Sequence, residues 1–251
     1  MTDPSAKSPR TAAILIIGNE VLSGKIQDAN SPYLLRELYA LGVKVQRVLT
    51  IPDELDVIQR EVRLASSRYD YVFTSGGIGP THDDVTIPAV AAAFSVSLVT
   101  SEALVALARH RYEEQITDAT LRMTRIPEGC ELIFAPSLRY PVALMHNVYI
   151  FPGVPEFLRA KFEAIKERFR DLPYHLVRIF TRQGESVLAA SLEATLERFP
   201  GLDIGSYPRF DTDEYRVMLT LESKDQCLLR GARDFLLSQL ATQELVRVTE
   251  A

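Results

Sequence analysis

The sequence predicts an α/β fold in which a doubly wound, mostly parallel sheet is followed by a second, smaller α+β domain. Strand-like and helix-like segments alternate over residues 12–171, which is typical of a parallel sheet with helices on both faces. After Asp171-Leu172-Pro173 the pattern changes to a compact β-α-β-β-α-β order. We therefore expect a flexible tail over residues 1–11, an α/β domain over 12–171 and a small α+β domain over 172–251.

Hydrophobic periodicity places the elements of the larger domain. Residues 12–17 form an uninterrupted, β-branched apolar run that predicts a buried strand. Asp28 can cap a helix, and Asp53 follows a proline and can open the next one. Further strands are predicted over residues 43–51 and 71–75, with a hairpin at 142–145 and 148–151. The predicted helices cover residues 28–41, 53–65, 85–94, 101–115 and 156–169.

The same reasoning gives the small domain four strands and two helices. The strands are predicted over residues 175–181, 203–207, 215–221 and 245–248. The helices are predicted over residues 185–199 and 226–240.

Composition excludes several classes of protein. The chain has 251 residues, 47% hydrophobic and 24% charged, with a net charge of −5, as an ordinary globular protein does. No apolar run approaches the roughly 20 residues that span a bilayer, and Met1–Thr11 lacks a secretory signal, so we expect a cytoplasmic protein without a membrane partner. Acidic residues outnumber basic ones on both sides of residue 171, which disfavours nucleic acid. Cys130 and Cys227 lack CxxC spacing and are predicted to be reduced thiols.

The strongest chemical signal is SGGIGPTHDDVT at residues 75–86, between a predicted strand and a predicted helix. Its glycines allow positive φ, so successive N–H groups can converge on phosphate oxygens at the start of the helix. The candidate phosphate-binding residues are Gly76, Gly77, Ile78, Gly79, Pro80 and Thr81. A plain structural turn remains an alternative. Adjacent Asp83 and Asp84 repel each other unless they cap the helix or hold a cation.

Polar residues also follow the first two predicted strands. Neighbouring strands of a doubly wound sheet end at one crevice, and ligands bind there. Gly18, Ser23, Gly24 and Asp28 are therefore candidates for nucleotide contact. Glu20 and Asp53 add carboxylates to the same edge. For Asp28 and Asp53, helix capping is the structural alternative.

These segments resemble a known family. IIGNEVLSGKIQDAN at residues 16–30, TIPDE at 50–54 and SGGIGPTHDDVT resemble the molybdopterin-binding domain family, which molybdopterin adenylyltransferases and competence/damage-inducible proteins share. NVYIFPGVPEFLR, LDIGSYPRF and YRVMLTLES, which begin at residues 147, 202 and 215, are similar to the amino-terminal part of eukaryotic FAD synthases. The resemblance implies a three-layer α/β domain followed by a small domain of KH-like topology.

The resemblance also assigns roles to residues. The two aspartates essential in the adenylyltransferases fall on Asp53 and Asp84, which become the expected catalytic residues. The family's phosphate-binding loop falls on Gly76, Gly77, Gly79 and Thr81. Relatives use divalent cations, which implies Co²⁺, Mn²⁺ or Mg²⁺ held by Glu20, Asp83 and Asp84. Asn19 stands where the family commonly has an aspartate, which removes one possible metal ligand.

The expected function is metal-dependent hydrolysis of the diphosphate bond of FAD or ADP-ribose, giving AMP. Such a reaction needs charge neutralised and a water placed in line, which phosphate-binding amides and carboxylates can do. The alternatives are a molybdopterin-binding protein or adenylyltransferase of molybdenum-cofactor biosynthesis, or a non-catalytic regulatory relative. The expected partner is a nucleotide or pterin, and the resemblance implies a homo-oligomer. Because the sequence ends at Ala251, we expect neither a deamidase domain nor an FAD-forming domain.

Overall fold

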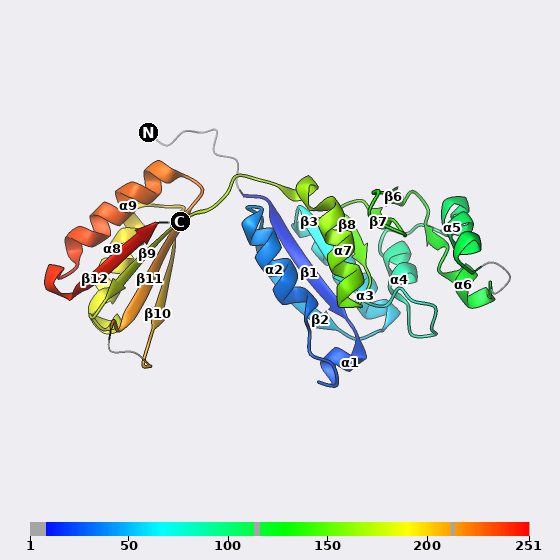
Figure 1. Ribbon diagram of the computed structural model, residues 1–251, viewed down its shortest axis with the longest axis horizontal. Coiled ribbons are helices and arrows are strands. Elements are labelled where there is room, and N and C mark those ends of the chain that lie inside the picture. The colour runs from blue at the N-terminus through cyan, green and yellow to red at the C-terminus, as the bar shows by residue number, and fades with distance from the viewer. Residues whose placement is uncertain (1–8, 113–115, 212–213, 251) are drawn as a thin grey trace. The chain divides into compact units, whose positions relative to one another are not determined.

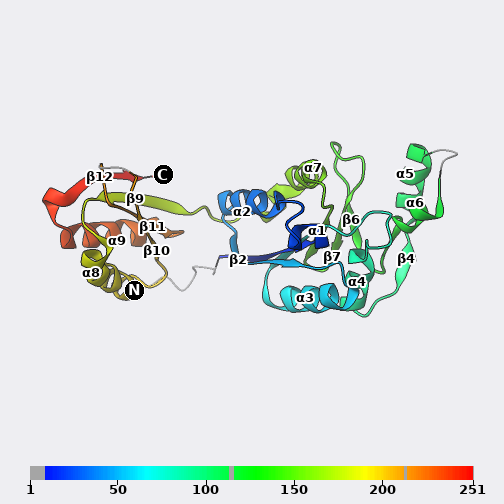
Figure 2. The same ribbon diagram turned by 90° about the horizontal axis from the view of Figure 1, so that it is seen from below.

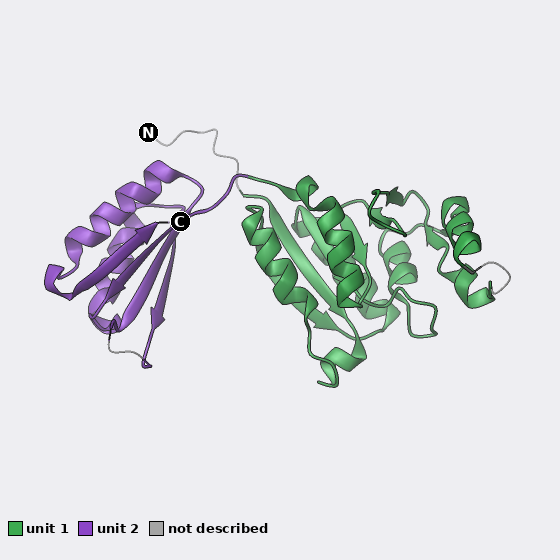
Figure 3. Cartoon of the chain, viewed as in Figure 1, with its two compact units in different colours: residues 1–171 green, residues 172–251 purple. Residues whose placement is uncertain are grey.

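The chain forms two compact units, residues 1–171 and 172–251 (Figure 3). The computed structural model describes residues 9–112, 116–211 and 214–250. None of the helices in these ranges combines the length and the apolar composition needed to cross a bilayer. Cys130 and Cys227 are free thiols, as predicted.

Unit 1 is built on a six-stranded sheet of order β2-β1-β3-β8-β7-β6 (Figure 1). Its strands are β1 (Thr11–Ile17), β2 (Lys44–Ile51), β3 (Tyr71–Ser75), β6 (Glu131–Ile133), β7 (Val142–Met145) and β8 (Val148–Phe151). The first four strands in the sheet order are parallel, and β7 and β6 are antiparallel additions. The register brings the carboxyl ends of β2, β1, β3 and β8 to one edge, since Ile17 pairs with Ile51 and Ser75 with Phe151. The chain order reverses between β1 and β3, where such sheets bind ligands.

Helices cover both faces of this sheet, which confirms the three-layer architecture (Figure 2). They are α1 (Asn19–Leu22), α2 (Asn30–Ala40), α3 (Leu55–Arg68), α4 (Thr86–Ala93), α5 (Glu102–Tyr112), α6 (Asp118–Arg122), α7 (Pro155–Ile165) and the 3₁₀ turn η2 (Lys166–Phe169). α2 and α7 pack on one face, and α3 and α4 on the other. Alternate residues of β1 enter the two cores, with Ile14 in one and Leu15 in the other.

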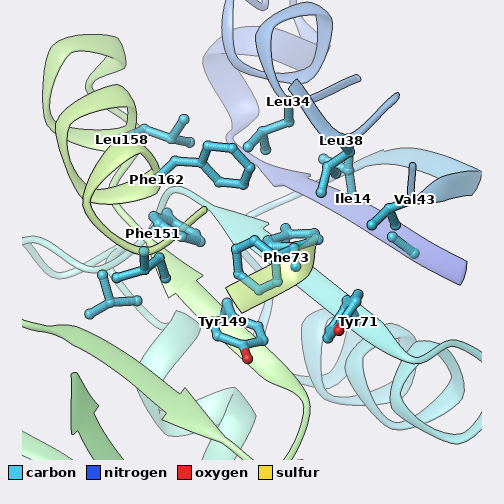
Figure 4. Close-up of a cluster of buried hydrophobic side chains, with 14 of the residues drawn as sticks. Ile14, Leu34, Leu38, Val43, Tyr71, Phe73, Tyr149, Phe151, Leu158 and Phe162 are labelled. Carbon is cyan, nitrogen blue, oxygen red and sulfur yellow. The ribbon is translucent and has the colours of Figure 1, made fainter. Parts of the chain in front are cut away.

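An aromatic cluster fixes the central strands beneath α2 and α7 (Figure 4). Phe73 on β3 is fully buried and stacks on Tyr149 of β8 with ring centroids 5.6 Å apart. Its ring also meets the edges of Phe162 and Phe169 at 6.0 and 5.0 Å. Such aromatic pairs stabilise the fold by more than the burial of their apolar area alone. We therefore expect the carboxyl ends of β3 and β8 to be held in a fixed position.

Several short elements were not predicted. β4 (Leu98–Thr100) and β5 (Arg125–Pro127) form a separate antiparallel pair. β6 also has three residues, and α6 has five. The helix predicted over residues 101–115 is α5, and residues 113–115 lie outside the described residues. The helix predicted to end at Phe169 is α7 to Ile165, followed by η2.

The chain enters and leaves unit 1 at the same corner. Residues 1–8 of the expected tail lie outside the described residues, but Thr11 begins β1 instead of belonging to a tail. The Arg10 amide donates to Asp171 Oδ2 at 3.1 Å, and the Arg10 carbonyl accepts from Lys44 at 2.9 Å. The Asp171 amide in turn donates to the Leu41 carbonyl at 2.8 Å. The two ends of the unit are thus fastened to each other and to the α2–β2 turn.

Unit 2 is a four-stranded antiparallel sheet of order β10-β11-β9-β12 with two helices on one face. Its elements are β9 (His175–Thr181), α8 (Glu185–Arg198), β10 (Asp203–Pro208), β11 (Val217–Ser223), α9 (Gln226–Gln239), the 3₁₀ turn η3 (Thr242–Glu244) and β12 (Leu245–Glu250). The predicted β-α-β-β-α-β order is confirmed. With this element order, a sheet in which every neighbouring pair is antiparallel has the split βαβ arrangement, and the KH-like likeness stays a prediction.

Candidate functional site

The candidate site lies at the edge of unit 1 where four parallel strands end. Two backbone hydrogen bonds join the loops that follow them: the Gly18 amide donates to Ile51 at 3.1 Å, and the Gly76 amide donates to Phe151 at 3.1 Å. Gly76 also packs against the Ile17 carbonyl at the end of β1, so the loops after β1, β2, β3 and β8 form one continuous rim.

The loop after β3 can be built only with glycine at its first two positions. Gly76 has φ of 112°, and a Cβ there would lie 2.1 Å from the Ile17 carbonyl oxygen. Gly77 has φ of 65°, and its Cβ would lie 2.3 Å from Thr86 Oγ1. The same Thr86 hydroxyl donates to the Gly76 carbonyl, and the Thr86 amide donates to Gly77. The loop is thereby held against the first turn of α4.

The middle of this loop offers unpaired donors. Within the described residues, no acceptor takes the N–H groups of Gly77, Ile78 or Gly79. Consecutive free amides in such a turn form an anion-binding concavity. Arg122 of α6 donates to the Pro80 carbonyl at 3.1 Å and brings a guanidinium beside the loop. Arg122 was not predicted, because α6 is a five-residue helix far along the chain.

Asp84 closes the second half of the loop instead of capping α4. Its Oδ2 accepts from the Thr81 amide at 2.8 Å and from the Thr81 hydroxyl, and it lies where a Cβ on Gly79 would be. The α4 N-terminus, at Val85, has no side-chain cap. Neighbouring Asp83 is exposed, and its pKa lies below the ordinary value, chiefly because of the Thr81 side chain.

Asp53 does not cap the helix it was predicted to open. α3 begins at Leu55 without a side-chain cap, whereas Asp53 Oδ2 accepts from the Asn19 amide at 2.8 Å across the rim. Burial raises the pKa of Asp53, the Asn19 hydrogen bond opposes this, and the charges of the three other acids at the rim raise it further. Those acids are Glu20, Asp83 and Asp84. The negative charges of these three acids therefore reach Asp53 across the rim.

The loop after β1 holds the remaining predicted residues. The Glu20 carboxylate folds back over Gly18, where a Cβ would lie 2.5 Å from Glu20 Oε1. Ser23 donates to the Glu20 carbonyl at 3.3 Å, and Gly24 has φ of 72° in the turn that ends α1. Asp28 Oδ1 accepts from the amides of residues 30 and 31 at 2.8 and 3.0 Å. Asp28 thus caps the start of α2, the structural alternative, while the other four residues shape the rim.

The metal site expected at Glu20, Asp83 and Asp84 stays a prediction, and the structure limits the number of side chains that could share it. In residues 9–112, 116–211 and 214–250, no group of three or more His, Cys, Asp or Glu side chains is arranged to hold a metal ion. Glu20, Asp83 and Asp84 share the rim, but they come from two separate loops.

Known families account for nearly the whole chain. Residues 13–171 match the family described as a probable molybdopterin binding domain. Residues 173–249 match the middle domain of FAD synthase. The two matches meet at the division between the units.

Individual relatives resemble the chain over different extents. A protein from Archaeoglobus fulgidus is 35% identical over 78% of this chain and 85% of its own length. A probable FAD synthase from Caenorhabditis briggsae is 31% identical over 89% of this chain, which covers only 48% of that relative. The crystal structure of the protein CinA, of unknown function, from Thermoplasma acidophilum aligns with a TM-score of 0.59 at 30% identity, over 64% of this chain and all of that one.

Proposed function

The chain belongs to the family of the probable molybdopterin binding domain, and from this premise we propose that the rim of unit 1 binds an adenylated nucleotide and hydrolyses its diphosphate bond to give AMP. The substrate would be of the FAD or ADP-ribose type. The observation that carries this proposal is the run of unpaired amides at Gly77–Gly79, on the same rim as the carboxylates whose charges act on Asp53.

The amides and Arg122 supply the binding half of the site. Three backbone donors fixed by glycine geometry can bind phosphate oxygens without rearranging, and such preorganised donors contribute to the electrostatic stabilisation of phosphoryl transfer. The Arg122 guanidinium, held at the Pro80 carbonyl, retains further N–H groups for a second phosphate.

The carboxylates fit a divalent cation shared with the substrate. Every acidic side chain at the rim offers oxygen, the ligand preferred by Mg²⁺ and Mn²⁺. Since no three of them are assembled, the protein would supply one or two ligands, from Asp53 and Asp84, and substrate phosphates would supply others, as is usual for Mg²⁺. Such a cation neutralises phosphate charge and lowers the pKa of bound water. Glu20 and Asp83 would support it through their charge.

A second function deserves a direct test because of the family itself. Residues 13–171 match a domain described as molybdopterin binding, so a pterin phosphate is the alternative ligand of the same amides. The match of residues 173–249 to an FAD synthase domain favours the flavin nucleotide. Family membership also supports the proposal that the chain self-associates, which sedimentation would measure.

The decisive experiment is a substrate panel. FAD, ADP-ribose, NAD and CoA are incubated with the protein and Mg²⁺, Mn²⁺ or Co²⁺, and AMP is quantified by chromatography. We expect AMP and FMN from FAD, with no release in EDTA. Intact FAD with every metal would exclude the flavin substrate, and tight molybdopterin binding without any turnover would favour the alternative.

A further inference from the structure

Asn30, the first residue of α2, ties that helix to the ends of two central strands. Its side chain is nearly fully buried, with 6% exposed. Its Nδ2 donates to the hydroxyl of Ser75 at 2.9 Å and to the carbonyl of Gly153 at 2.7 Å. Ser75 is the last residue of β3, and Gly153 follows β8 by two positions. One amide group therefore bridges the two strand ends next to the glycine loop.

This bridge lies directly behind the phosphate-binding loop. A Cβ on Gly153 would contact Gly76 Cα at 3.4 Å, so the two backbones touch. Ser75 in turn donates to the Pro152 carbonyl at 3.4 Å, which closes the network around the same turn. Both donors on Nδ2 are therefore used to fix the backbone from which the loop departs.

The other atom of this amide has no partner. Asn30 Oδ1 is buried and accepts no hydrogen bond from any residue that the structure describes. A buried carbonyl without a donor is destabilising, and such groups are uncommon outside sites where a ligand or water supplies the donor. Rotating the amide would place Oδ1 against the Gly153 carbonyl oxygen, which can only accept, so the hydrogen bond to Gly153 fixes the amide with Oδ1 unpaired. The orphan acceptor therefore marks a place for a donor from outside the protein.

We propose that Asn30 is a ligand-recognition residue: its Oδ1 accepts a hydrogen bond from a sugar hydroxyl of the nucleotide whose phosphate lies on the amides of Gly77–Gly79. In a 5′-nucleotide the sugar hydroxyls are the donors nearest to the phosphate, and Asn30 lies one residue contact away from Gly76. This inference rests on the proposed phosphate site, but it does not require that the bound nucleotide be hydrolysed.

The test measures binding of AMP and of 2′,3′-dideoxy-AMP to the full chain by calorimetry. The wild type should bind AMP about 10-fold more tightly than the dideoxy compound, as expected for one buried hydrogen bond. Asn30→Ala should weaken AMP binding by about the same factor and leave dideoxy-AMP unchanged, so the preference disappears. Ser75→Ala removes only one supporting contact of Nδ2 and should keep the preference.

Three results would overturn the inference. They are equal binding of both nucleotides by the wild type, no binding of AMP at all, or an equal loss for both ligands in Asn30→Ala. The first two need no variant, so the test holds even where Asn30→Ala does not fold. If the protein prefers AMP to the dideoxy compound but releases no AMP from FAD, hydrolysis of FAD is rejected and the role of Asn30 in recognition is supported.

Discussion

The two units have similar composition and similar layers, but their strands run in different directions. Both lay helices on a sheet around a hydrophobic core, and both carry more acidic than basic residues. In unit 1 four parallel strands end at one edge, so four loops meet there. In unit 2 every neighbouring pair is antiparallel, so its loops are divided between two edges. Strand direction, more than composition, concentrates the polar groups of this chain into a candidate site.

Glycines and aspartates behave differently in the two units for the same reason. Gly76 of unit 1 touches the backbone of another loop, whereas Gly201 of unit 2 has φ of 92° and open space around it. Asp225 of unit 2 accepts from the amides of residues 227 and 228 and caps α9. Asp53 instead reaches across to another loop. Residues that serve local geometry in unit 2 serve contact between loops in unit 1.

The largest effect on stability is expected when Gly76 of unit 1 is replaced by alanine and compared with the same replacement of Gly201 in unit 2. Gly76→Ala places a Cβ 2.1 Å from a backbone oxygen in addition to the strain of positive φ. We expect it to lower the free energy of unfolding by roughly 3 kcal/mol or more. Gly201→Ala adds only the strain, about 1 kcal/mol. Urea unfolding followed by circular dichroism measures both, and equal losses would contradict the close contact of the loops.

The second comparison is between Asp84 of unit 1 and Asp225 of unit 2. Each accepts hydrogen bonds from residues no more than three positions away in the chain. Asp84→Asn should retain the fold and lower kcat/KM for the proposed diphosphate hydrolysis by about 100-fold or more, since charge at the reacting phosphate is lost. Asp225→Asn should leave turnover unchanged and cost at most about 1 kcal/mol, because asparagine caps helices nearly as well. Steady-state kinetics with AMP detection measures the first, and thermal unfolding the second. Unchanged kcat/KM in Asp84→Asn would remove Asp84 from the active site.

The smallest effect concerns the charge of Asp53. Its pKa is raised in the folded state, so the native protein holds this proton more tightly than the unfolded chain does. The stabilisation is complete below the ordinary aspartate pKa of 3.8 and is lost as pH rises through the raised value. At neutral pH, Asp53→Asn keeps an acceptor for Asn19, removes the repulsion, and should therefore raise the free energy of unfolding by about 0.5 kcal/mol.

Thermal unfolding at low salt between about pH 3 and pH 7 measures this difference, which should vanish at the acid end. Added Mg²⁺ should stabilise the wild type more than Asp53→Asn, because the cation would need the carboxylate. A variant less stable than the wild type at neutral pH would show that the Asn19 contact outweighs the repulsion.

Local periodicity was enough to predict the long elements. β1 is an apolar run of buried residues, and the repeat of Leu55, Ile58, Val62 and Ala65 identifies α3. The three-residue strands β4 to β6 were missed, because so short a segment carries no period and pairs only when its partner is already in place.

The site was predictable where its residues lie next to the strands that carry them. The closely spaced glycines after β3 were enough to predict a tight loop there, because glycine is the residue that adopts positive φ most readily. For Asp53, expected as a catalytic residue with helix capping as the alternative, the sequence could not predict the contact with the Asn19 amide, because that amide lies on a different loop. Asn30 and Arg122 were missed for the same reason: their partners are 45 and 42 positions away, so no local pattern contains them.

The hydrogen bond between Arg10 and Asp171 brings the points where the chain enters and leaves unit 1 close together. Arg10 and Asp171 lie a single hydrogen bond apart, so we expect residues 10–171 to tolerate insertion into a loop of a host protein without stretching either chain. For the same reason a short linker could join the native ends and a new start could be opened in the turn at His146-Asn147. A permuted unit of this kind would present the same rim of loops from a chain that begins elsewhere.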